Sequence, residues 1–334
     1  VFGLPAPRTD RSMVSVSMRS IIVLAAVCAT FVPRSTYGQE AMCGPDRDLL
    51  IDQLIEYLGF DASHRDAMVS RGEIIHTGMS AGETLPEELA VAGVMLIVER
   101  PMEETVEIYL ADESFTSRQG ISEHGVVPEH AEGEAVRAAL HDARLDPYEA
   151  DEARLMANAK PGAKINLSAE EIATLAAFNP REPALVDKVS AAYREILAHR
   201  LVEFRENGLS GIEPYARGGD KSISPSRELA AAIDSMLFLE QHFPDFVRAL
   251  RHNPTTDGET GESRDFWIKK VMDGRPLFVL SHQVIVKAPT HALAGDLQFF
   301  AGHSYNSMLT VIGAVACGAN TLVVAVNHTF TDQV

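Results

Sequence analysis

Residues 277–309 read LFVLSHQVIVKAPTHALAGDLQFFAGHSYNSML, and their pattern decides the fold class. Apolar, β-branched and aromatic residues dominate, and Pro289 divides the stretch into two strand-like runs, 277–287 and 293–305. Because only a short turn separates the two runs, we expect them to pair antiparallel, with the chain turning at 289–292.

The same pattern continues on both sides of this stretch. Strand-like runs occupy 266–271, 307–316 and 321–329, and Asp273-Gly274 and residues 318–320 supply the turns between them. The sequence therefore predicts an antiparallel meander over about 265–330.

Helical patterns dominate the middle of the chain, about 133–252. Ser168 begins one helix with a capping box that ends at Glu171, and Ser224-Pro225 begins another, predicted to run to Gln241 with Leu229, Ile233 and Leu237 packed on the core. Two further strands are predicted at 73–79 and 89–98. With about seven strands and the helices segregated from them, the predicted class is α+β, a curved antiparallel sheet packed against a helical section.

Composition excludes several functions. The 334 residues carry a formal net charge of -18, which has the wrong sign for nucleic acid or an anionic membrane surface. The hydrophobic content of 46% predicts a sizeable core.

The N-terminal residues resemble a signal peptide. Met18 precedes Arg19, an apolar run at 21–32 follows, and Thr36 and Gly38 provide the small residues of a cleavage site. We therefore interpret residues 1–38 as an extension with a signal peptide and residues 39–334 as a single domain, exported to the periplasm or outside the cell, with no stable membrane span after cleavage. Cys43 and Cys317 would remain, and they could form one disulfide in an oxidising compartment.

Several segments together resemble a known but uncharacterised family of exported bacterial proteins. They include RGEIIHTGM (71–79), NAKPGAKINLSAEEI (158–172), GIEPYARGGDKSISPSREL (211–229), FFAGHSYNSML (299–309) and LVVAVNHT (322–329). His282 and His303 match two histidines of the family's meander, whereas Asn306 stands where the family has Asp. The family's pattern continues past residue 334, which implies that the chain is cut short. The order of elements also resembles helix-grip (START-like) ligand-binding domains.

Strand alternation selects the candidate site residues. Alternate residues of a strand share a face, so Phe299, Ala301, His303 and Tyr305 should lie together. If His282 and His328 on the neighbouring strands share that face, the sheet would offer an apolar pocket with a few polar groups. We therefore predict a ligand site made by His282, His303, Tyr305, Phe299 and His328, with no metal and no cofactor.

Three functions remain open at this stage. The first is an exported protein that binds a hydrophobic small molecule or lipid in the sheet concavity. The second is an enzyme that uses His303 and His282 as acid and base, because imidazole pKa values lie near neutrality. The third is a structural or interaction protein whose sheet is filled by its own side chains.

Overall fold

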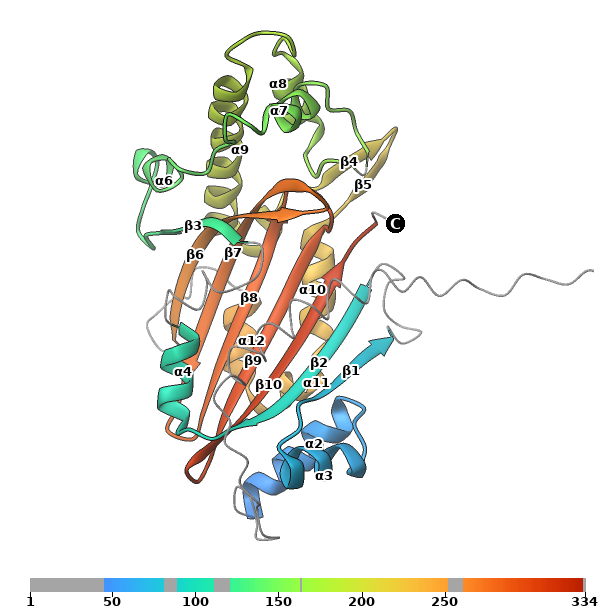
Figure 1. The fold of residues 1–334 in the computed structure, drawn as a ribbon, viewed down its shortest axis with the longest axis vertical. Coiled ribbons are helices and arrows are strands. Elements are labelled where there is room, and N and C mark those ends of the chain that lie inside the picture. Colours follow the sequence, from blue (N-terminus) through green and yellow to red (C-terminus); the bar gives the residue numbers. More distant parts are fainter. Residues whose placement is uncertain (1–44, 81–88, 111–120, 163, 252–260, 333–334) are drawn as a thin grey trace, which may run out of the picture.

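The computed structural model describes residues 45–80, 89–110, 121–162, 164–251 and 261–332, and every structural statement below concerns these residues. Eight strands form one antiparallel sheet in the order β1-β2-β10-β9-β8-β7-β6-β3 (Figure 1). The strands of this sheet are β1 (Ile75–Ser80), β2 (Leu89–Val98), β3 (Ile121–Val127), β6 (Glu262–Met272), β7 (Arg275–Lys287), β8 (His291–Ala301), β9 (Ser307–Cys317) and β10 (Asn320–Phe330).

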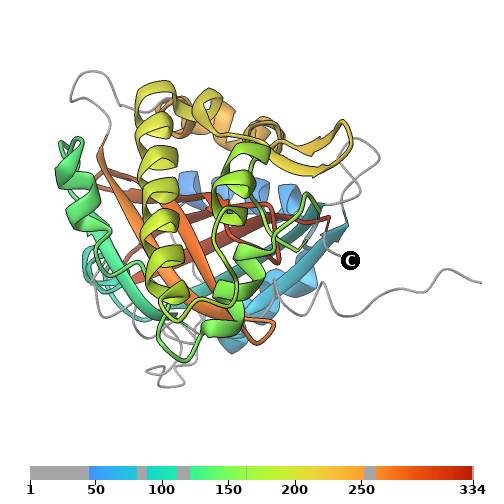
Figure 2. The same cartoon turned by 90° about the horizontal axis from the view of Figure 1, so that it is seen from above.

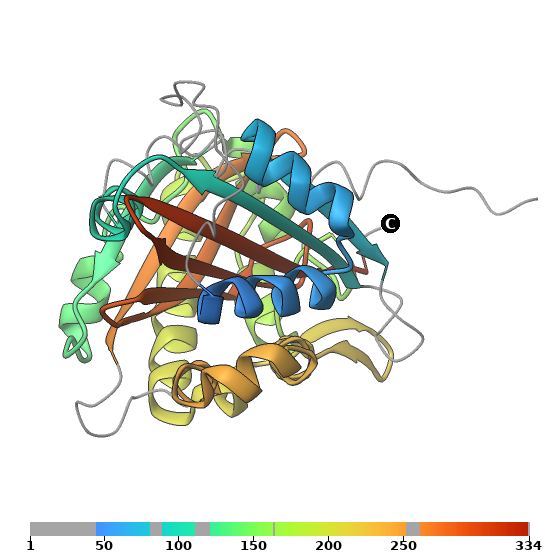
Figure 3. The same ribbon diagram turned by 90° about the horizontal axis from the view of Figure 1, so that it is seen from below.

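Most helices cover one face of this sheet. Figure 1 shows α10, α11 and α12 behind the strands and α4 in front of them. Figure 2 shows α9 on the same side as α10–α12. Figure 3 shows α2 beside that group of helices. The helices are α2 (Pro45–Tyr57), α3 (Ala62–Arg71), α4 (Met102–Leu110), α6 (Glu134–Ala139), α7 (Ala150–Ala157), α8 (Ala169–Ala176), α9 (Leu185–Asn207), α10 (Pro225–Ser235), α11 (Leu237–His242) and α12 (Pro244–Arg251). Among the described helices, none is both long and apolar enough to cross a membrane.

The α+β class and the C-terminal meander are confirmed. β6 to β10 pair in chain order, and β7 pairs with β8 as expected, with Lys287 opposite Ala292 next to the turn. The two early strands join the same sheet because β2 pairs with β10.

One strand of the sheet and one small hairpin were missed by the sequence analysis. β3 pairs with β6 at the edge of the sheet, and its ISEHGVV sequence lacks the apolar alternation of the other strands because most of its residues are only partly buried. β4 (Tyr215–Gly218) and β5 (Lys221–Ile223) form a short hairpin inside the stretch expected to be helical. The sheet therefore has eight strands rather than about seven.

The two faces of the sheet carry separate clusters of apolar side chains. The largest cluster lies between the meander and the helices, and it includes Phe204 of α9, Phe246 of α12 and Phe278 of β7. On the opposite face, Met102 of α4 packs with Ala292 and Ala314. We call these two sides the helix face and the α4 face.

The predicted helix from Pro225 to Gln241 is wrong in its second half. α10 ends at Ser235, and α11 begins after Met236 in a new direction. Leu229 and Ile233 are buried as expected, but Leu237 is 68% exposed because it begins α11 rather than continuing the apolar stripe of α10.

Candidate functional site

His282 lies in the middle of β7 on the helix face. Its ring packs 5.3 Å from the ring of Phe204, and its Nδ1 lies 2.7 Å from Oδ1 of Asp265. The other oxygen of Asp265 accepts a hydrogen bond from Nε of Arg205 at 2.6 Å. Burial alone would raise the pKa of Asp265, but the contacts with His282 and Arg205 outweigh it and lower that pKa. The three side chains thus tie α9 to β6 and β7.

The second nitrogen of the His282 ring has a different environment. Nε2 is buried and has no hydrogen-bond partner among the described residues. The ring is nevertheless enclosed by Phe204 and the strands, since only 2% of His282 is exposed. His282 is not among the residues that line the two apolar cavities described below.

His303 follows β8, in the connection to β9. Its Nδ1 lies 2.7 Å from Oγ of Ser304, and its Nε2 lies 3.1 Å from the carbonyl oxygen of Pro276. Ser304 in turn donates a hydrogen bond to Asp273, in the turn between β6 and β7. Burial is the main cause that lowers the pKa of His303, and the charge of Arg275 adds to it. His303 therefore contacts the start of β7 through Nε2, and through Ser304 it is linked to the β6–β7 turn.

The prediction that Phe299, Ala301, His303 and Tyr305 share one face is wrong. β8 ends at Ala301, so His303 and Tyr305 belong to the connection rather than to the strand. Phe299 packs on the helix face, where its ring stacks on that of Phe204 at 4.1 Å. Ala301 and Tyr305 pack on the α4 face with Val279 and Met308.

A β-bulge causes this change of face. Leu280 lies opposite Phe300 and Ser281 lies opposite Gln298, which leaves Phe299 without an opposite residue. Both phenylalanines consequently reach the helix face, and the alternation shifts by one residue after them. Gly302 follows directly, and a Cβ atom there would lie 2.8 Å from Oη of Tyr193. The absence of a side chain at Gly302 therefore allows this close approach of Tyr193.

His328 lies on β10, opposite Leu309, and faces α10. Its Nε2 lies 3.3 Å from Oγ of Ser235, and its Nδ1 is buried without a partner among the described residues. Burial lowers the pKa of His328 to about 4, so the ring is neutral at neutral pH.

The five predicted residues therefore do not converge on one pocket. Each of the three histidines has its own neighbours, and Tyr305 lies on the opposite face from His282 and His328. Nor do the described histidine, cysteine, aspartate and glutamate side chains include a group of three that could hold a metal ion.

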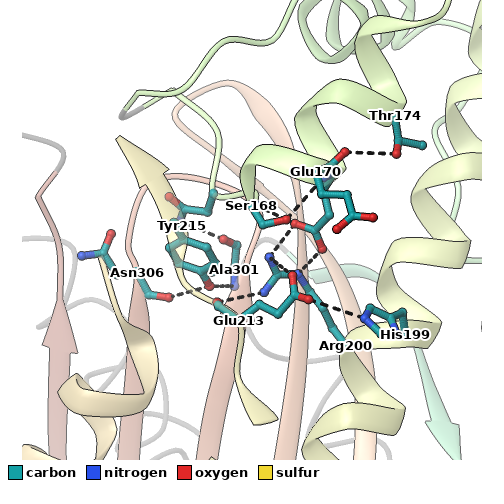
Figure 4. A network of polar contacts seen from close by, with 11 residues as sticks. Ser168, Glu170, Thr174, His199, Arg200, Glu213, Tyr215, Ala301 and Asn306 are labelled. Atoms are coloured by element: carbon teal, nitrogen blue, oxygen red, sulfur yellow. Dashed lines mark hydrogen bonds and ion pairs between the residues drawn. The ribbon is translucent and has the colours of Figure 1, made fainter. Parts of the chain in front are cut away.

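The polar run at 302–307 is held by a buried network (Figure 4). Arg200 of α9 forms a bidentate ion pair with Glu171 of α8, at 2.7 and 2.6 Å, and its guanidinium lies over the ring of Phe300. Tyr215 donates a hydrogen bond to the carbonyl oxygen of Asn306 at 3.1 Å. Asn306 also donates to Glu228 of α10 through its side chain. Tyr215 of β4 and Glu228 of α10 thus hold the β8–β9 connection, and Arg200 packs on the end of β8, which is a structural role.

A cavity on the α4 face offers a more suitable ligand site. It lies between α4 and five strands, β2 and β7 to β10, and has a volume of about 600 Å³ when the space open to solvent is counted. The lining is almost entirely apolar and includes Val106, Tyr109, Ile285, Ala294, Ile312 and Ala325.

A row of polar side chains borders this cavity. Cross-strand pairing puts five polar residues in line over five strands, directly beside the apolar row of Ile285, Ala294, Ile312 and Ala325. We call this set the polar row: Arg264, Gln283, Asp296, Thr310 and Asn327.

The members of the polar row are bonded to one another or to the next row. Nε of Arg264 donates to Gln283 at 2.8 Å, and Nδ2 of Asn327 donates to Thr310 at 2.8 Å. Ser281 donates to Asp296. Gln283, Asp296 and Asn327 are buried rather than solvated.

The sequence analysis did not identify the polar row. Each strand contributes only one residue, so the row exists only after the strands are paired in register. Only one sequence signal pointed to the polar row: Gln283 and Asp296 are polar residues at the same distance from the turn on the two sides of a hairpin, so they lie opposite each other.

A second apolar cavity, of about 660 Å³ on the same measure, lies on the helix face between α2, α11 and the strands β9 and β10. Tyr57, Phe238, Gly313 and Val324 are among its lining residues, with His291 at one side.

No protein-family model, curated protein or solved structure matches this chain. The resemblance to a family of exported proteins and to helix-grip domains therefore stays a prediction.

Proposed function

We propose that the protein binds an amphipathic small molecule on the α4 face of its sheet. The apolar part of the ligand would occupy the cavity beneath α4, and its polar part would contact the polar row. The observation that carries this proposal is the border between the apolar lining of the cavity and the polar row. In register across four strands, an apolar row that lines the cavity adjoins a row of buried hydrogen-bonding side chains.

Physical chemistry supports an amphipathic rather than a purely apolar ligand. Burial of a polar group without full hydrogen bonding destabilises the folded protein. If the sheet needed only a filled core, apolar residues in place of Gln283, Asp296 and Asn327 would make the fold more stable. A ligand with a polar end compensates for that burial.

We also propose that the protein is exported. Cys317 is disulfide-bonded, with its partner outside the described residues, and disulfides persist in oxidising compartments. The signal-peptide pattern lies outside the described residues as well, so it supports this proposal from the sequence alone.

Two adjacent residues allow a matched test of the binding site. Gly313 lines the cavity on the helix face, and Ala314 lines the cavity on the α4 face. A leucine side chain at either position would fill a similar volume, and it would do so in one of the two cavities only. We expect Ala314→Leu to weaken decanol binding at least tenfold, measured by displacement of the fluorescent dye N-phenyl-1-naphthylamine, and Gly313→Leu to leave it within twofold of the wild type.

The other outcomes contradict the proposal. Loss of binding in Gly313→Leu alone would move the ligand to the helix face. If the wild type binds neither decanol nor the dye, the third function, a sheet filled by its own side chains, is the correct one. Circular dichroism and a melting curve of both variants verify that each is folded.

A further inference from the structure

Among the described residues, the buried carboxylate of Asp296 has no cationic partner within an ion pair. Asp296 is 7% exposed, and none of the ion pairs among the described residues includes it. One carboxylate oxygen accepts a hydrogen bond from Ser281, while its neighbours in the polar row, Gln283 and Thr310, are neutral. An ionised carboxylate removed from water loses much free energy unless a cation or several donors replace its hydration.

Two cations on this face, Arg264 and Lys270, contact groups other than Asp296, although Nη2 of Arg264 is buried without a hydrogen-bond partner among the described residues. Arg264 lies two strands away, roughly 10 Å on the spacing of strands in a sheet. Its Nε donates to Gln283, and its guanidinium lies over the ring of Phe266. Lys270 lies 5.0 Å from the ring centre of Tyr305, whose hydroxyl donates to Gln298 rather than to Asp296.

Asp296 also has a fixed position relative to the cavity. It lies two residues along β8 from Ala294, which lines the cavity, and both side chains are on the α4 face. The second oxygen of its carboxylate has no hydrogen-bond partner among the described residues. The carboxylate therefore lies at the border between the polar row and the apolar lining.

We infer that the ligand is an alkylammonium compound, an aliphatic chain that ends in a protonated amine. This inference rests on the proposed function and adds the chemistry of the ligand's polar end. The ammonium group carries three donors and no acceptor, so it can bind the free oxygen of Asp296 and a neighbouring amide or hydroxyl oxygen at once. A fatty acid would place a second negative charge beside Asp296, and an alcohol would leave that charge without a counter-ion.

Three ligands of equal chain length test the inference on the wild-type protein. Decylamine, decanol and decanoate are titrated calorimetrically at pH 7, below the concentrations at which they form micelles. We expect decylamine to bind at least tenfold more tightly than decanol, and decanoate to bind most weakly. A preference for decanol or decanoate overturns the inference without the need for any variant.

The isosteric change Asp296→Asn then assigns the effect to one residue. It should remove the preference for decylamine over decanol and leave the affinity for decanol within threefold. Glu129→Gln is the control, because it removes one negative charge from an exposed loop away from the sheet face. An unchanged amine-to-alcohol ratio in Asp296→Asn, or an equal loss in Glu129→Gln, contradicts the role of Asp296.

Failure of this inference differs from failure of the proposed function. If decanol binds and Ala314→Leu abolishes its binding, the amphipathic site stands even when the amine is not preferred. If none of the three ligands binds, both proposals fall together.

Discussion

At His282, His303 and His328, the residue type was a poor guide to the role. Each imidazole contacts a different part of the fold: the Asp265 carboxylate, the Pro276 carbonyl oxygen, or the Ser235 hydroxyl. A histidine accepts and donates hydrogen bonds equally well, so it is as suited to joining two structural elements as to binding a ligand. His328 is the one whose protonation the structure resists most clearly.

His328 predicts a pH dependence of stability. Burial lowers its pKa to about 4 in the folded protein, whereas the unfolded value is the ordinary 6.5. Between these two values the unfolded chain binds the proton and the folded protein does not, so acidification favours unfolding. The contribution of His328 to the free energy of unfolding is fully present above pH 6.5. It is lost progressively as the pH falls to 4, and the loss is about 3 kcal/mol at most.

Urea unfolding at a series of pH values from 7.5 to 4 measures this effect. We compare the unfolding free energy of the wild type with that of His328→Gln. The wild-type value minus the variant value should be constant above pH 6.5 and should shrink or reverse below that pH. His141→Gln is the control at an exposed histidine. A pH-independent difference for His328→Gln would mean that the ring gains a proton as easily in the folded as in the unfolded protein.

Among the helices, α10 shows how burial depends on where an element ends. Its apolar stripe, Leu229 and Ile233, would reach Leu237 one turn later if the helix continued. Met236 instead leaves the helical conformation, and the chain begins α11. The periodic pattern was therefore correct for the element and wrong for its length.

Ile233 and Leu237 supply a matched pair for this element. Ile233 is 1% exposed, so Ile233→Asp should lower the unfolding free energy by at least about 4 kcal/mol, since it removes buried apolar area and buries an unpaired charge. Leu237 is 68% exposed, so Leu237→Asp should change stability by less than about 0.5 kcal/mol. Chemical denaturation measures both, and similar costs for the two variants would show that α10 extends through Leu237.

The bulge at Phe299 has consequences beyond β8. Because it lets both Phe299 and Phe300 reach the helix face, Phe299 can stack on Phe204 while Phe300 lies beneath the guanidinium of Arg200. The bulge also sets which residues of the β8–β9 connection face each side of the sheet.

For the whole molecule, Cys317 at the end of β9 is disulfide-bonded. A covalent link of this kind restricts the unfolded chain, so its reduction should lower the unfolding free energy by about 2–4 kcal/mol. A melting curve of the wild type with and without a phosphine reductant should therefore show a lower Tm in the reduced sample.

Cys317→Ser is the control for this experiment. The variant should melt at the temperature of the reduced wild type, and the reductant should have no effect on it. A free thiol at Cys317 in protein isolated from an oxidising compartment would contradict both the disulfide and the support that it lends to export.

The sequence by itself determined the α+β class, the meander and its pairing, and several helix starts, such as the capping box of Ser168 and Glu171. These depend on local physics: the periodicity of apolar residues, turn-forming residues and capping side chains. The edge strand β3 escaped because a partly solvated strand has little apolar alternation.

Only the tertiary structure decided which side chains meet. Strict alternation placed Phe299, His303 and Tyr305 together, but a single bulge and the end of β8 separated them, and neither feature has a local signal strong enough to predict. The polar row arises in the same way. Gln283, Asp296 and Thr310 look like ordinary outward residues in each strand, and they become a continuous buried row only because register aligns them across the sheet.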